Sequence, residues 1–127
     1  MKVLALDFGS ARTGVAVSDP TGTVARPLCI VEWAGTEAGL ARLRELVAEE
    51  QAERVVVGLP LTLRGNRGEQ AVETEQFVEE LRAAVSVPVE TFDERFTTIL
   101  AGPGAGEDAR AAAHLLSSYL EWSSRRS

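Results

Sequence analysis

The sequence has little that suggests export or a membrane: it contains one cysteine and no long apolar run. Cys29 alone cannot form an internal disulfide, so we expect a protein of a reducing compartment, the cytoplasm. The apolar stretches, such as 3–6 and 55–57, fall far short of the roughly 20 residues that a membrane span needs. The first residues also lack the apolar core and cleavage site of a signal peptide. No membrane partner is expected.

Positive charge is also scarce, because 13 Lys and Arg stand against 19 Asp and Glu, a net charge of −6. Non-specific binding to nucleic acid is driven mainly by Lys and Arg, which displace counterions from phosphate, so the composition excludes a general electrostatic clamp. Binding of any polyanion must therefore depend on positive charge that is concentrated at one place. Arginines gathered near one edge could do this, as could metal ions that offset a cluster of acids.

What is present is the pattern of an α/β domain, which we expect to occupy residues 1–127. Strands are predicted at 3–8, 14–18 and 23–33, since these stretches are apolar and are separated by Gly, Ser, Asp and Pro. An amphipathic helix capped by Thr36 should run to about residue 51, and a second helix is predicted from 69 to 85. Strands at 54–60 and 87–94 follow these helices, and a helix at 107–122 ends the pattern.

Carboxylates are expected to gather at one edge of the sheet. Asp7 ends an apolar strand, where an ionised side chain cannot be buried without a partner. A crossover through one helix makes the flanking strands parallel, so the strands that end near Asp7 and at Asp93 and Glu94 finish at the same edge. Asp108 lies on the sheet-facing stripe of the last helix. Such oxygens suit Mg²⁺ or Mn²⁺, and two such ions favour phosphodiester hydrolysis. No Ser-His-Asp or Cys-His arrangement competes.

Four segments carry a resemblance to a known family: LDFGSARTGVAVSD at 6–19, VVVGLPL at 55–61, DERFTT at 93–98 and DARAAAHLLSSYL at 108–120. In this order they resemble the YqgF/RuvX family. These RNase H-like proteins are described as Holliday junction resolvases and as nucleases that process the 5′ end of pre-16S ribosomal RNA. The resemblance implies an α/β, RNase H-like fold, with a five-stranded mixed sheet of order 3-2-1-4-5 and helices on both faces.

The resemblance also implies the site and its chemistry. Asp7, the pair Asp93 and Glu94, and Asp108 correspond to the family's metal-binding carboxylates, and we favour Glu94 over Asp93 as the ligand. The implied activity is a cytoplasmic, divalent-metal-dependent endonuclease with two Mg²⁺ or Mn²⁺ ions. Its substrate is a structured nucleic acid, either precursor ribosomal RNA or branched DNA. A resolvase that makes paired cuts is expected to be a homodimer, whereas a processing nuclease could act alone.

One departure from the family is visible. Members usually carry a helix and a Lys/Arg-rich segment between the DER-x-TT motif and the last aspartate, but here only residues 99–107 intervene. Either the link is short in this protein, or a basic stretch is absent from this sequence. We favour the second interpretation, because a basic arm would relieve the conflict between a negative net charge and a polyanionic substrate.

Four arginines are predicted in or beside loops at the acidic edge, where a guanidinium can contact phosphate through two donors. They are Arg12, Arg64, Arg67 and Arg95. The alternative is that they are solvated surface residues, or that Arg95 pairs with a carboxylate and orients it. Gly58 and Pro60 either allow a close backbone approach at the strand end or simply end the strand.

Two other functions fit parts of the sequence. The segments 7–10 and 14–17 also resemble the phosphate-binding hairpin of actin-like ATPases, but those proteins need two domains to enclose ATP. A non-catalytic module that binds nucleic acid or takes part in ribosome biogenesis is the second alternative. The acidic set argues against it, because clustered carboxylates without a function would only repel one another.

Overall fold

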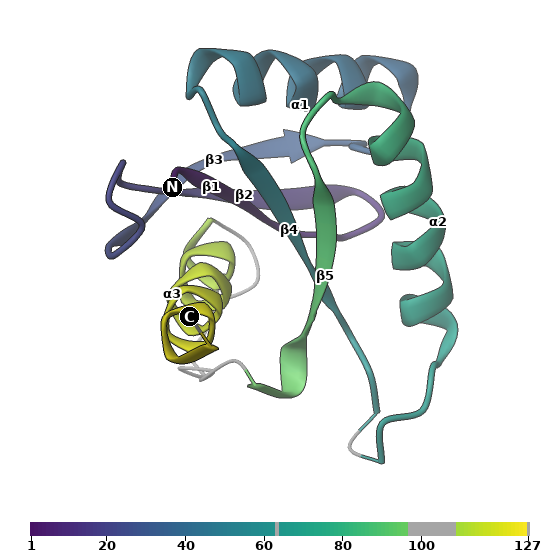
Figure 1. The fold of residues 1–127 in the computed structure, drawn as a ribbon. Coiled ribbons are helices and arrows are strands. Elements are labelled where there is room, and N and C mark those ends of the chain that lie inside the picture. The colour runs from purple at the N-terminus through teal and green to yellow at the C-terminus, as the bar shows by residue number, and fades with distance from the viewer. Residues whose placement is uncertain (63, 97–108, 127) are drawn as a thin grey trace.

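Five strands form one mixed sheet in the computed structural model, which describes residues 1–62, 64–96 and 109–126. The strands are β1 (Val3–Asp7), β2 (Arg12–Ser18), β3 (Ala25–Glu32), β4 (Arg54–Leu59) and β5 (Val89–Asp93). Their order is β3-β2-β1-β4-β5. β1 is antiparallel to β2 and parallel to β4, which is in turn parallel to β5 (Figure 1). The predicted strand order and mixed sheet are confirmed.

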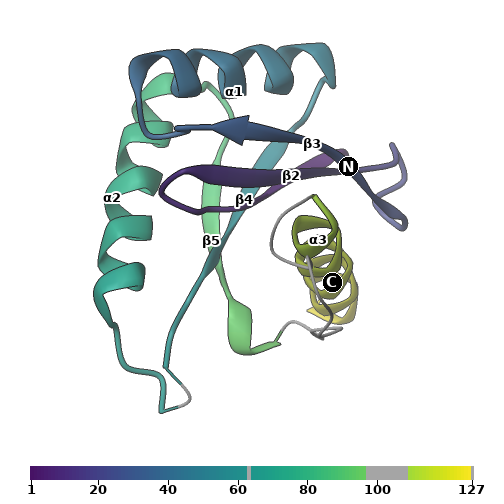
Figure 2. The same ribbon diagram turned by 180° about the vertical axis from the view of Figure 1, so that it is seen from behind.

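Helices cover both faces of this sheet. α1 (Glu37–Glu49) and α2 (Glu69–Ala84) pack on one face, and α3 (Arg110–Arg126) lies across the sheet from them (Figures 1 and 2). The Thr36 side chain caps α1 as predicted, because its Oγ1 accepts a hydrogen bond from the Gly39 N–H at 3.1 Å. The predicted last helix was too short at its end, since α3 continues to Arg126. Within the described residues, no helix has the length and apolarity that a membrane crossing needs.

Alternation along the strands divides the core into two clusters. In β1, Leu4 and Leu6 pack towards α1 and α2, whereas Val3 and Ala5 pack beneath α3. β4 alternates in the same way, because Val56 lies on the α3 side. Since successive strand residues point to opposite faces, this pattern fixes the face on which each polar residue at a strand end must lie.

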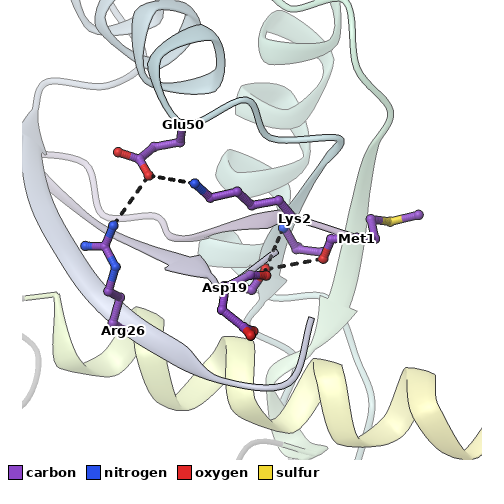
Figure 3. Close-up of polar contacts among 7 residues, drawn as sticks. Met1, Lys2, Asp19, Arg26 and Glu50 are labelled. Carbon is purple, nitrogen blue, oxygen red and sulfur yellow. Dashed lines mark hydrogen bonds and ion pairs between the residues drawn. The ribbon is translucent and has the colours of Figure 1, made fainter. Parts of the chain in front are cut away.

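Ion pairs tie α1 to the edge of the sheet where β1 begins. Glu50, just after α1, has its Oε1 3.3 Å from Lys2 Nζ and 3.5 Å from Arg26 Nη2 (Figure 3). The Ser18 hydroxyl accepts a hydrogen bond from the Val3 N–H at 2.8 Å at the same edge. These contacts lie at the opposite end of β1 from Asp7, so they support the fold and leave the acidic edge free.

Leu116 tests how far α3 contributes to the stability of the whole fold, because its side chain is fully buried (0% exposed) beneath the sheet. We expect Leu116→Ala to lower the free energy of unfolding by about 2–5 kcal/mol, through lost burial and the cavity that remains. Urea denaturation measures this. The exposed neighbour Ser117 is the control, and Ser117→Ala should change stability by less than about 0.5 kcal/mol. Equal effects would show that α3 is not part of the cooperative core.

Candidate active site

The carboxyl ends of β1, β4 and β5 bring three residues to one place. One residue from each strand packs beneath α3: Ala5, Val56 and Phe92. Two residues further along the chain, on the same side, come Asp7, Gly58 and Glu94. Strand pairing aligns these ends, because Leu6 is level with Val57, and Gly58 is level with Phe92. The register of the three strands therefore brings Asp7 and Glu94 to the same edge.

Asp7 and Glu94 are in direct contact, since their carboxyl groups share a hydrogen bond. Burial raises the pKa of Asp7, while the hydrogen bond with Glu94 opposes that change. Burial, followed by the charge of Asp7, raises the pKa of Glu94 to about 7. Two carboxyl groups can share a hydrogen bond only if one of them carries a proton, and the shifts place that proton on Glu94.

Gly58 makes room for this contact. A Cβ at position 58 would lie 2.7 Å from Glu94 Oε1, 3.0 Å from Glu94 Cγ and 3.1 Å from Leu115 Cδ2. The sequence suggested that Gly58 allows a close backbone approach or ends the strand. The group that approaches is instead a side chain, and it is half of the acidic pair.

Asp93 has a different environment from its neighbour Glu94. It ends β5 and is bound by Arg95, whose Nε lies 2.9 Å and whose Nη2 lies 2.6 Å from Asp93 Oδ2. The hydrogen bond from Arg95 lowers the pKa of Asp93 below its usual value. The structure thus brings Glu94, and not Asp93, against Asp7. Arg95 orients a carboxylate, the alternative role considered for it above.

The Arg95 guanidinium also lies over Gly65, in the loop between β4 and α2. A Cβ at Gly65 would be 3.1 Å from Arg95 Nη1, and the Gly65 φ of +84° favours glycine in any case. Sequence reasoning missed this contact, because a glycine in a polar loop carries no signal that a side chain lies over it.

The fourth predicted carboxylate, Asp108, lies outside the described residues. Among residues 1–62, 64–96 and 109–126, no group of three or more His, Cys, Asp or Glu side chains is arranged to hold a metal ion. The described part of the site is therefore a pair of carboxyl groups. No arginine or lysine contributes to the pKa shift of either member.

The four predicted phosphate-binding arginines fall into two groups. Arg67 pairs with Glu75, with its Nε 2.7 Å from Oε1, and Arg95 is held by Asp93. Arg12 and Arg64 are exposed, and in the described chain neither has an ion-pair partner. Arg12 begins β2 and Arg64 lies in the loop after β4, so both belong to segments at the acidic edge.

The sheet order, the helices on both faces and the carboxyl ends at one edge define a protein with the RNase H-like fold. The fold is similar to that of RuvC from Thermus thermophilus, which was solved in complex with a Holliday junction substrate. That match has a TM-score of 0.67 at 17% sequence identity and covers 98% of this chain and 96% of the other. At this identity the likeness concerns the fold.

The chain belongs to the RuvX family, whose model, described as Holliday junction resolvase, matches residues 1–122. A Chloroflexus aurantiacus protein, named as a candidate pre-16S rRNA nuclease, is 48% identical over 99 residues. That match takes in 78% of this chain but 65% of the relative, so the chain spans just under two thirds of that protein's length.

A relative from Syntrophomonas wolfei with the same name is 36% identical and is matched over 95% of this chain and 94% of its own length. The alignment runs over 133 positions, more than the 127 residues of this chain. This relative therefore has residues without a counterpart here.

The raised pKa of Glu94 predicts a pH dependence of stability in protein kept free of divalent ions by a chelator. The folded state holds the proton up to about pH 7, whereas the unfolded chain releases it near the ordinary glutamate pKa of 4.5. The free energy of unfolding should fall as pH rises through this window, because the folded state then binds more protons than the unfolded state. Thermal unfolding at pH 5, 6, 7 and 8 measures this.

Glu94→Gln removes the titrating group, so this variant should lose less stability than the wild type between pH 5 and pH 8. Glu121→Gln on the exposed surface of α3 provides the control and should retain the wild-type slope. Parallel curves for the wild type and Glu94→Gln would mean that Asp7 and Glu94 do not share a proton.

Proposed function

We propose that this protein is a divalent-metal-dependent endonuclease that hydrolyses phosphodiester bonds in structured nucleic acid. The observation that carries the proposal is the contact between Asp7 and Glu94. Both carboxyl groups are half-buried, and no positive side chain of the described residues compensates them. Such a pair destabilises a fold unless a cation or a proton offsets the repulsion. Perturbed carboxyl groups of this kind are typical of functional sites.

The residues fit a divalent cation. Their donors are carboxylate oxygens, the ligands that Mg²⁺ and Mn²⁺ prefer, and they lie at an edge open to solvent. When bound, one or two such ions would supply Lewis-acid stabilisation of the phosphate and a more acidic water. Asp7 and Glu94 would hold the ions, and Glu94 must release its proton to do so.

Asp108 completes the proposed ligand set on the basis of the sequence. It precedes Ala112 by four residues and Leu115 by seven, and both of those residues pack beneath the sheet. Residues at this spacing in a helix share one face. Because Leu115 also lies beside Gly58, this face of α3 is directed towards the acidic pair.

The other residues of the edge position the substrate and the acids. Arg95 holds Asp93, so the charge of Asp93 is compensated and Glu94 is left to act with Asp7. Arg12 and Arg64 are the arginines proposed to contact phosphate. The family match supports this interpretation over an actin-like ATPase, and the acidic pair supports it over a non-catalytic binding module.

Precursor ribosomal RNA is the first substrate to test, because relatives at 36% and 48% identity carry a pre-16S rRNA nuclease name. The family description gives Holliday junctions as the second substrate. Both present the same phosphodiester group, so the choice depends on shape. Symmetric cleavage of a junction would require two copies of the chain, which sedimentation in the presence of branched DNA measures.

Asp7→Asn tests the activity. Labelled precursor rRNA and labelled branched DNA are incubated with Mg²⁺, with Mn²⁺ or with chelator. We expect metal-dependent cleavage by the wild type and a loss of at least about 100-fold in the variant, since one ligand oxygen loses its charge. Cleavage that persists at the wild-type rate in Asp7→Asn would refute the proposal, as would binding of both substrates without any cleavage.

Gly58→Ala tests positioning without removing a carboxylate. The added Cβ displaces Glu94 from its place against Asp7, so we expect cleavage to fall at least about tenfold while the free energy of unfolding falls by about 1–3 kcal/mol. Gly35→Ala is the matched control, because a Cβ there meets nothing within 4 Å. Full activity in Gly58→Ala would place the catalytic residues elsewhere.

A further inference from the structure

A cleft of about 290 Å³ lies on the face of the sheet opposite to the acidic pair. Phe8, which directly follows Asp7, points to this face and stacks on Phe77 of α2 with ring centroids 4.3 Å apart. Asp7 and Phe8 therefore leave the same strand end in opposite directions. Five of the nine residues that line the cleft are aromatic or acidic: Phe8, Trp33, Phe77, Glu73 and Glu80.

Trp33 is the unusual residue of this cleft. Its side chain is 58% exposed, and its φ of 50° lies in the left-handed region that a bulky residue seldom adopts. The backbone explains the conformation, because the Trp33 N–H donates to Ala11 O at 2.9 Å and its carbonyl accepts from the Thr36 N–H at 3.0 Å. These contacts need no indole. In the part of the chain that the structure describes, the ring of Trp33 has no aromatic or cationic partner.

The charge of the cleft is of one sign. Glu73 and Glu80 lie two turns apart on the same stripe of α2, and none of the lining residues is Lys or Arg. Two other acids of α2 are compensated, Glu75 by Arg67 and Glu79 by Arg82. Across the described ranges, Glu73 and Glu80 have no such partner.

An exposed indole that shares a cleft with two uncompensated carboxylates matches a guanidinium group. Arginine stacks on the face of tryptophan, and its planar fork donates to carboxylates. A phosphate group has the opposite charge preference, so the nucleic-acid backbone is a poor occupant. We propose that this cleft binds an arginine side chain presented by a basic segment of a partner protein.

Such a partner complements the rest of the chain. The net charge is −6, and several of the arginines are already bound to acids of the chain itself. A basic partner seated on the α2 face would supply cations that this chain lacks. Because the cleft and the acidic pair lie on opposite faces of the sheet, the partner leaves the carboxylates accessible. The inference depends on the cleft and not on the proposed nuclease activity.

The probe is a blocked five-residue peptide that carries two arginines, titrated into the protein while the indole N–H resonance of Trp33 is followed by NMR. The resonance of the second tryptophan is identified with Trp122→Phe. We expect saturable shifts at Trp33 and none with a peptide in which glutamine replaces both arginines. Comparable shifts with the glutamine peptide, or an unmoved Trp33, would overturn the proposal.

Paired variants separate the cleft from general charge attraction. Glu73→Gln with Glu80→Gln should raise the Kd of the arginine peptide at least about fivefold, since a stacked guanidinium loses both of its partners. Glu79→Gln with Glu121→Gln removes the same charge away from the cleft and should leave the Kd within about twofold. An equal loss in both pairs would contradict a specific site. The proposal would also fail if a short single-stranded oligonucleotide saturated the shift of the Trp33 resonance with a lower Kd than the peptide. The cleft would then bind a nucleobase.

Discussion

The contact between Asp7 and Glu94 is the constraint on which the site depends, and the fold leaves these acids no way to separate. Leu4, Leu6, Val55 and Val57 are almost fully buried on one side of β1 and β4, so the register of these strands is fixed by the core. A slip by one residue would exchange the two faces, so that side chains fitted beneath α3 would meet α1 and α2 instead. The burial of the core thus keeps in contact two carboxyl groups that would repel each other once both are ionised. A cation that binds between them would offset that repulsion.

Two neighbouring acids behave differently because of what lies beside them. Asp93 is compensated by Arg95, which lowers its pKa, whereas Glu94 faces Asp7 and has its pKa raised to about 7. The end of β5 sends the two side chains to different surroundings, and Gly58 leaves the space that Glu94 occupies. This divergence of two adjacent carboxyl groups is consistent with the proposed roles, in which Asp93 is structural and Glu94 holds a cation. Arg95 also rests over Gly65, so the loop after β4 and the end of β5 are held together by the same guanidinium.

The sequence was sufficient for the elements, the sheet order and the edge at which the acids meet, because these follow from periodicity, parallel crossovers and the four motifs. It could not decide which of Asp93 and Glu94 contacts Asp7, since that depends on where Arg95 lies after folding. Gly58 was interpreted as a backbone feature, although its role is to admit the side chain of Glu94, 36 positions further along the chain. The stacking of Phe8 on Phe77, which line the same cleft, was not predicted either. Contacts between distant side chains leave no period in a sequence.

The distribution of charge limits how a polyanion can approach. On the α2 face the carboxylates of Glu73 and Glu80 are uncompensated, so phosphate is repelled there. At the carboxyl edge, Arg12 at the start of β2 and Arg64 in the loop after β4 are exposed, and neither is bound to an acid of the described chain. A nucleic acid would therefore gain an attraction at this edge that the α2 face does not offer. For the proposed activity, a net charge of −6 would then favour the approach of phosphate at this edge over its approach at the α2 face.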